Sequence, residues 1–390
     1  MKKLKDLYLR LCMTALFSKV TEKPIFSHFE RIVREDAREE KIKAYAAFVG
    51  EIYSGRLSLP ELVKKYVFED ENVYIKSAAH DFEVSPSVIS ALKTELAALS
   101  DFASLNVNDF VRSLEIEELL PFDSAKTDIY LEYMDRVKNV SRYGYGIFSA
   151  SPMFRLADSG VIEPIMSADK TTIDKFIGYK EERDAVLRNT EAFVEGRPAA
   201  NTLLCGDAGT GKSSTVKAIA NHFFDKGIRL IELRKDQLKM LPEVMGKVSE
   251  NPLKFIIFID DLAFNKSDDN FSMLKAALEG SASAKADNAV IYATSNRRHI
   301  IKESFSDRDG DDVHRNDSMQ ETLSLSERFG LVVSFTKPNK QLYLEIVHAL
   351  AERFEIKIPA NELDVRAEAF ALKKGSRSAR CAEQFIDSLL

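Results

Sequence analysis

The sequence is poor in cysteine. Its 390 residues contain three, Cys12, Cys205 and Cys381, which lie far apart and form no C-x-x-C pair. An odd number of widely spaced cysteines argues against a disulfide framework, and the missing pairs leave no pattern typical of a zinc site. Neither cross-links nor structural zinc is therefore expected to stabilise this chain.

An excess of positive charge is also lacking. The chain has 55 lysine and arginine residues against 61 aspartate and glutamate residues, a net charge of −6 with the two signs well mixed. Proteins that bind nucleic acid depend largely on basic patches that attract phosphates, and no part of this sequence shows one on that scale. A nucleic-acid partner stays open as an alternative, but the charge distribution does not support it.

Long apolar runs are absent as well. No stretch approaches the roughly eighteen apolar residues that a membrane span needs. The N-terminal MKKLKDLYLRLCMTALFSKV begins with lysines, but Asp6 and Arg10 interrupt it and no small-residue cleavage site follows. Its leucines recur at helical spacing instead. We expect a cytoplasmic protein that has no membrane association.

The first part of the chain has helical patterns throughout. Residues 1–142 predict an all-α domain; in one example, Ser85 can cap a helix whose first turn accommodates Pro86. This domain is expected to bind an unidentified protein partner. Residues 143–174 are interrupted by Gly, Pro and Ser and predict an irregular connector.

The pattern changes after the connector. Short runs that are apolar throughout now alternate with helical stretches, at 202–206, 229–233, 255–261, 289–296 and 331–335. Such runs are typical of strands buried on both faces, so residues 175–338 predict an α/β domain with a parallel sheet between helices. Residues 339–390 return to helical patterns and predict a small C-terminal helical domain.

A glycine-rich loop follows the first of these strands. GDAGTGKS at 206–213 matches G-x-x-x-x-G-K-[ST] between a strand and a helix. The glycines allow backbone N–H groups to approach phosphates, and the helix N-terminus adds a partial positive charge. We expect this loop to bind ATP with Mg²⁺ through Gly206, Asp207, Ala208, Gly209, Thr210, Gly211, Lys212, Ser213 and Ser214. The alternative is a glycine-rich turn without a ligand.

Two loop residues and two strand-end acids have specific predicted roles. Lys212 would reach the β- and γ-phosphates, and Ser213 would supply a hydroxyl ligand to Mg²⁺. FIIFIDD carries Asp260 and Asp261 to the carboxyl end of a buried strand, where α/β sheets bind ligands. Asp260 is expected to contact the Mg²⁺ shell, and Asp261 to polarise the attacking water. A solvated acidic turn is the alternative.

The order and spacing of these motifs resemble those of AAA+ ATPases. That resemblance implies a core sheet of strand order 5-1-4-3-2 and a helical C-terminal lid. It places Ile177, Gly178 and Tyr179 beside the adenine, and Asn296 of YATSN at the sensor that orients the attacking water.

Three arginines receive roles from the same resemblance. Arg328 of SLSERFGL is the candidate arginine finger, which would complete a neighbouring subunit's site and so implies a homo-oligomer. GSRSAR resembles the second sensor, with Arg377 as the first choice for the γ-phosphate contact and Arg380 as the second.

More narrowly, residues 170–390 resemble the bacterial AAA-type family called domain of unknown function 815. The resemblance rests on NTEAFVEGRPAANTLLCGDAGTGKSS, FIDDLAF, VIYATSNRRHII and LSLSERFGL. One difference from most AAA+ ATPases is Asp261, which occupies a position where they have the longer glutamate.

These features together predict an ATPase that couples turnover to the remodelling or loading of a partner. Hydrolysis would move the lid, and the N-terminal domain would carry that motion to the partner. Two alternatives remain open: an ATP-dependent switch or scaffold with weak hydrolysis, and a P-loop kinase that phosphorylates a small molecule.

Overall fold

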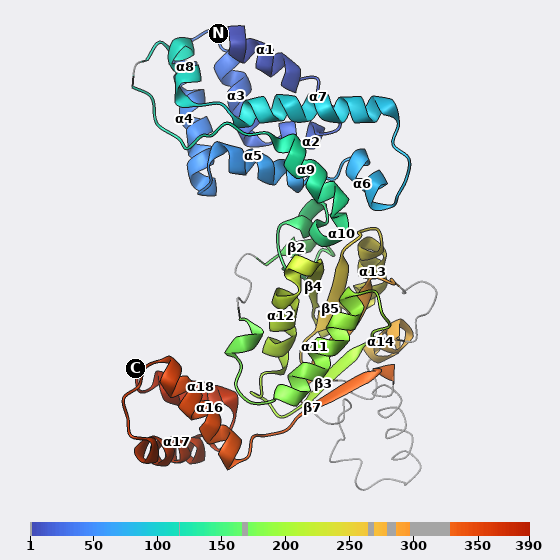
Figure 1. Ribbon diagram of the computed structural model, residues 1–390, viewed down its shortest axis with the longest axis vertical. Helices are drawn as coiled ribbons and strands as arrows, with labels where there is room; N and C mark the ends of the chain where they lie inside the picture. The colour runs from blue at the N-terminus through green and yellow to red at the C-terminus, as the bar shows by residue number, and fades with distance from the viewer. Residues whose placement is uncertain (1, 117, 166–170, 264–268, 279–285, 297–327) are drawn as a thin grey trace. The chain divides into compact units, whose positions relative to one another are not determined.

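The computed structural model describes residues 2–116, 118–165, 171–263, 269–278, 286–296 and 328–390 (Figure 1). The chain divides into two compact units, Met1–Ala150 and Ser151–Leu390. Within the described residues, no helix combines the length and the apolar character that crossing a bilayer requires.

The first unit is entirely helical where it is described. Its N-terminal helix follows the leucine spacing, since Leu4, Leu7 and Leu11 are all buried. Ser85 caps α7 by accepting a hydrogen bond from the Val88 N–H, as predicted. The α-helices are α1 (Lys2–Leu11), α2 (Ser18–Thr21), α3 (Pro24–Arg34), α4 (Arg38–Gly55), α5 (Leu59–Phe68), α6 (Val73–Ala79), α7 (Pro86–Ala103), α8 (Val107–Leu114), α9 (Ile129–Lys138) and α10 (Val140–Tyr143).

The second unit is built on a seven-stranded sheet. The strand order is β2-β1-β4-β5-β6-β3-β7, and every neighbouring pair is parallel except β1 with β2. The strands are β1 (Met153–Leu156), β2 (Ile162–Pro164), β3 (Thr202–Gly206), β4 (Ile228–Leu233), β5 (Lys254–Ile259), β6 (Ala289–Ser295) and β7 (Leu331–Phe335).

The five strands predicted from apolar runs are all present. Numbered among themselves, they follow the order 5-1-4-3-2 from β7 to β4, which confirms the predicted fold class. The sheet differs by two added strands, β1 and β2, which come from the segment 143–174 that was expected to be irregular. Phe154 and Leu156 are buried there, and β1 pairs with the backbone of β4, so the glycine and proline of this segment mark strand ends instead.

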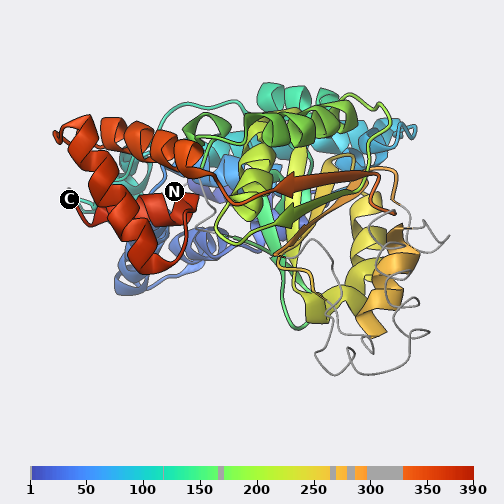
Figure 2. The ribbon, with the colours of Figure 1, turned by 90° about the horizontal axis from the view of Figure 1, so that it is seen from below.

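Helices cover both faces of the sheet. Figure 2 shows α11 (Lys180–Val194) and α12 (Lys212–His222) on one face, with α13 (Leu241–Ser249) and α14 (Asp269–Leu278) on the other. The direction of the strand order reverses after β4, and right-handed crossovers therefore place α12 and α13 on opposite faces.

Three further helices form the C-terminal lid. They are α16 (Lys340–Arg353), α17 (Ala360–Lys374) and α18 (Ala379–Asp387), and they enclose a small apolar core of their own. Ile177 packs against that core from the segment before α11, so the lid contacts the chain that leads into the glycine-rich loop.

Candidate nucleotide-binding site

The carboxyl ends of three neighbouring strands meet at one edge of the sheet. In register, Cys205 of β3 pairs with Ser295 of β6, and Ile259 of β5 pairs with Ala293 of β6. The residues that follow these strand ends therefore lie beside one another. They are the glycine-rich loop, the acids Asp260 and Asp261, and Asn296.

Backbone geometry explains the glycines of the loop. Gly206 has φ of +128°, and a Cβ atom there would lie 2.1 Å from the backbone oxygen of Phe335. Only glycine permits this approach of β3 to β7. Gly209 and Gly211 also have positive φ, and α12 begins directly after Gly211 at Lys212.

The Lys212 ammonium group is buried beneath the loop. Its Nζ donates to the backbone oxygens of Gly206 at 3.0 Å and Asp207 at 2.7 Å, and to Oδ1 of Asn296 at 3.0 Å. Burial lowers the pKa of Lys212 from its usual value. All three acceptors are uncharged, so the cation would gain strongly from an anionic phosphate at this position.

Ser213 and Asp260 lie in direct contact. The Ser213 Oγ donates to Asp260 Oδ1 at 2.6 Å, and the buried Thr294 hydroxyl donates to the same oxygen at 2.5 Å. A hydroxyl and a carboxylate are hard oxygen donors that suit Mg²⁺, which is usually held by one or two protein ligands plus phosphate and water. The two side chains thus fit the predicted metal site.

Asn296 joins the loop lysine to the second acid. Its Nδ2 donates to Asp261 Oδ1 at 2.7 Å, while its Oδ1 accepts from Lys212. The Asp261 backbone has φ of +52°, and its N–H donates to Thr294 Oγ1 at 3.0 Å. The structure therefore brings together Lys212, Asn296 and Asp261 as one hydrogen-bonded chain.

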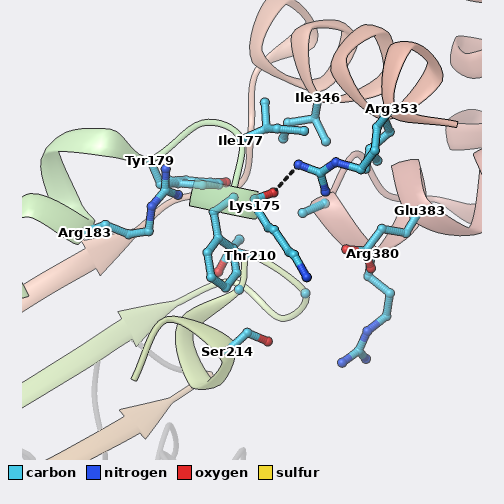
Figure 3. Close-up of a pocket in the computed structure, with 15 residues that line it drawn as sticks. Lys175, Ile177, Tyr179, Arg183, Thr210, Ser214, Ile346, Arg353, Arg380 and Glu383 are labelled. Atoms are coloured by element: carbon cyan, nitrogen blue, oxygen red, sulfur yellow. Dashed lines mark hydrogen bonds between the residues drawn. The ribbon is translucent and has the colours of Figure 1, made fainter. Parts of the chain in front are cut away.

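A pocket opens between the loop, the segment before α11 and the lid (Figure 3). Gly209, Thr210, Gly211 and Ser214 line its loop side. Ile177 and Tyr179 line it from the segment before α11, and Ile346 and Leu350 line it from α16. A polar end rich in N–H groups and an apolar end match the two ends of a nucleotide.

Gly178 contributes through packing. It has φ of +72°, and a Cβ atom there would lie 2.7 Å from Leu342 Cδ1. The next residue, Tyr179, donates its hydroxyl to the Thr336 backbone oxygen at 2.6 Å, and burial raises the pKa of Tyr179 to about 12. These contacts fix the segment against the start of the lid.

The two candidate second-sensor arginines differ in their surroundings. Arg377 donates Nε and Nη2 to the two carboxylate oxygens of Glu368, at 2.9 and 2.8 Å, and does not line the pocket. Arg380 does line it, and its backbone N–H lies 3.4 Å from the Gly209 oxygen. These surroundings favour Arg380 over Arg377, because the Arg377 guanidinium is occupied by its bidentate partner. Which arginine contacts the γ-phosphate stays a prediction.

Arg328 lies apart from this pocket among the described residues. It is half-buried and lies three residues before the start of β7. Residues 323–327, the rest of the motif that suggested an arginine finger, are outside the described part of the chain.

A family comparison bears directly on this site. The family described as "Protein of unknown function (DUF815)" matches residues 149–390, more than half of the chain. The chain belongs to the DUF815 family. The match spans the sheet, the loop and the lid, and the strand order is the one that the AAA+ resemblance implied for the five predicted strands.

Other similarities are more distant. This DUF815 protein is 26% identical over 212 residues to Chaperone protein ClpB 2 of Parasynechococcus marenigrum, covering 48% of this chain and 21% of the relative. It is 27% identical over 125 residues to Chaperone protein ClpB of Rickettsia bellii, covering 27% of this chain and 13% of the relative. The match thus spans about a fifth or less of these relatives' length.

A solved structure of Thermotoga maritima RuvB, a Holliday junction branch migration motor, is also similar. It has a TM-score of 0.33 at 14% identity, and the match covers 56% of this chain and 71% of that structure.

Several residues of the DUF815 site escaped the sequence analysis. Thr294 braces both acids, and the pocket is also lined by Lys175, Phe176, Arg183, Arg353 and Glu383. Arg353 follows Ile346 by seven residues, a spacing that places both on one helix face, and it donates to the Lys175 backbone oxygen at 2.7 Å. The spacing could have identified Arg353 as a pocket residue only if the face of α16 that packs against the loop had been known.

Proposed function

We propose that this DUF815 protein binds ATP with Mg²⁺ and hydrolyses it. The observation that carries the proposal is the 2.6 Å hydrogen bond between Ser213 Oγ and Asp260 Oδ1, next to the buried ammonium group of Lys212. A cation suited to the phosphates and two oxygen ligands suited to the metal lie next to one another. A glycine-rich turn that binds no ligand would not need this arrangement.

Each side chain then has a chemical task. Lys212 binds the β- and γ-phosphates, and Arg380 approaches the γ-phosphate from the lid; both stabilise charge in the transition state. Asp261 accepts a proton from the attacking water, and Asn296 orients that water. Mg²⁺ held by Ser213 and Asp260 neutralises charge on the phosphate oxygens when it is bound.

The proposal extends to assembly and partners. Arg328 would act as an arginine finger on the nucleotide of a second copy of the chain, which makes the working form a homo-oligomer. Turnover would move the lid relative to the sheet, and the helical first unit would carry the motion to a protein partner that is remodelled or loaded.

One observation favours a second candidate, an ATP-dependent switch or scaffold with slow hydrolysis. Asp261 has a shorter arm than glutamate, and Asn296 Nδ2 already engages its carboxylate at 2.7 Å. A carboxylate occupied in this way must exchange that partner for water before it can act as a base. The switch and the ATPase bind the same nucleotide and differ in their rate of phosphate release.

Calorimetry on the full chain with ATP and Mg²⁺ tests the proposal. We expect binding by the native protein and its near loss in Lys212→Ala. Lys217→Ala is the matched control, because Lys217 lies on the same helix but pairs with Glu232, outside the pocket. Absence of ATP binding by the native protein would refute both candidates. If the native protein binds ATP but releases phosphate no faster than Asp261→Asn does, only the switch remains.

A further inference from the structure

One residue of the pocket differs from the other charged lining residues in the sign of its charge. Four cationic side chains line the pocket, Lys175, Arg183, Arg353 and Arg380, and they suit an anionic ligand. Glu383 is the only carboxylate among the described lining residues. A carboxylate repels phosphates, so Glu383 suits a different part of a nucleotide.

Glu383 is also not committed to another side chain. It lies one turn after Arg380 on α18, so both belong to the same helix face. Within the described residues it makes no hydrogen bond and no ion pair, although Arg380 and Arg353 act on it electrostatically. The side chain is exposed at the edge of the pocket. Partial loss of hydration and the nearby negative charge of Asp387 raise the pKa of Glu383.

The position of Glu383 restricts what it can contact. The neighbouring Arg380 lies against Gly209 of the phosphate-binding loop, and α16 supplies Ile346 and Leu350 to the apolar wall. Figure 3 shows Glu383 with Arg353 on the lid side of the pocket, across from Thr210 and Ser214. In a nucleotide with its phosphates at the loop and its base at the apolar wall, the sugar would lie between the two, on the side of Glu383.

We propose that Glu383 binds the ribose of the nucleotide by accepting hydrogen bonds from its vicinal hydroxyl groups. An ionised carboxylate is an acceptor only, with two oxygens, and a ribose presents two adjacent hydroxyl donors. An acidic residue that accepts from ribose hydroxyls is also the device of dinucleotide-binding folds. No group of three or more metal-binding side chains occurs among the described residues, which gives the carboxylate no alternative partner of that kind. The inference rests on the proposed function, since it assigns sugar specificity to the same site.

Binding of ATP, 2′-deoxy-ATP and 3′-deoxy-ATP to the full chain, each with Mg²⁺, tests the inference. We expect one or both deoxy analogues to bind about tenfold more weakly than ATP, because a hydrogen bond to an ionised group is lost. Glu383→Ala should bind ATP and the analogues alike. Gln384→Ala is the matched control, since it truncates an exposed polar side chain of the same helix outside the pocket and should keep the preference.

The possible failures are distinguishable. Equal binding of ATP and both analogues by the native protein, or a preference that persists in Glu383→Ala, would overturn the ribose assignment and leave ATP binding intact. Inosine triphosphate, which lacks the adenine amino group, distinguishes a contact to the sugar from one to the base. If it binds more weakly than ATP to the native protein but not to Glu383→Ala, the contact is to the base and the ribose assignment is overturned. Loss of binding to every nucleotide by the native protein would refute the proposed function itself, and the ribose contact with it.

Discussion

The carboxylate of Asp207 accepts a hydrogen bond from the backbone N–H of Lys337 at 2.8 Å. Asp207 belongs to the glycine-rich loop, and Lys337 lies between β7 and the first lid helix. The Asp207 N–H also donates to the Phe335 oxygen at 3.1 Å. The loop and the start of the lid are therefore joined at the point where the lid would have to turn.

Removal of this contact should loosen the lid. In Asp207→Ala, the Lys337 N–H loses a charged acceptor; because this hydrogen bond is exposed, water can replace it and we expect a cost of about 1 kcal/mol. We expect faster amide hydrogen exchange around residues 337–343 and weaker ATP binding. Asp207→Asn retains an acceptor oxygen and should behave closer to the native protein, while identical exchange in all three proteins would contradict a role in lid attachment.

Replacement of the second acid should separate binding from hydrolysis. Asp261→Asn preserves the shape of the side chain but removes its capacity to take a proton. We expect ATP affinity to be retained and steady-state phosphate release to fall at least about tenfold, equivalent to about 1.4 kcal/mol of barrier. Unchanged turnover would mean that another group activates the water.

The two lid arginines should differ in effect. Arg380→Ala removes a cation that lines the pocket, and we expect at least about a tenfold loss of turnover. Arg377→Ala breaks the ion pair with Glu368. That pair is partly exposed and screened by solvent, so we expect a small loss of lid stability and little effect on turnover. Measurement of phosphate release at saturating ATP compares them, and a larger loss in Arg377→Ala would reverse the assignment made from the pocket.

A finger that acts in trans should allow complementation. Arg328→Ala and Asp261→Asn would each be poorly active alone, since one lacks the finger and the other lacks the base. In a mixture, some shared sites contain a native Asp261 and a native Arg328, and activity should partly recover. If no recovery occurs in mixed assemblies whose formation is verified by mass, Arg328 does not complete a neighbour's site.

Glycine at the start of the loop should be essential for stability. The added Cβ of Gly206→Ala would lie 2.1 Å from a backbone oxygen, so β3 and β7 would have to separate. We expect a loss of several kcal/mol, on the order of the costs known for overpacking and backbone strain. Gly246→Ala in α13 is the control, because nothing lies within 4 Å of its added Cβ, and it should stabilise by up to about 1 kcal/mol in thermal or urea unfolding.

The sequence was enough to predict the sheet and the family, but not all the residues that line the pocket. Runs of apolar residues predict buried strands because both faces of such strands are covered, and the five strands were predicted in this way. Their order was predicted from the resemblance to AAA+ ATPases. The strand Met153–Leu156 was missed because it is four residues long and lies among glycine, proline and serine. A run this short carries little periodicity, and its pairing with β4 depends on contacts distant in sequence.

The same limit applies to side chains. The loop residues are recognisable since their spacing is fixed by local backbone chemistry. The choice between Arg377 and Arg380 depended on Glu368, nine residues from Arg377 on the preceding helix, and no local pattern reveals that partner. Glu383 and Arg353 gain meaning only from the packing of the lid against the loop. The roles of all these residues stay predictions that the variants above can check.

Strand β1 has a mechanical consequence. Ala150 ends the helical unit and Met153 opens a strand that is hydrogen-bonded to β4, so only two residues of tether separate them. At about 3.5 Å per residue, two residues span at most about 7 Å. A pull on the chain at Ala150 would therefore reach the main-chain hydrogen bonds between β1 and β4 through two residues of linker.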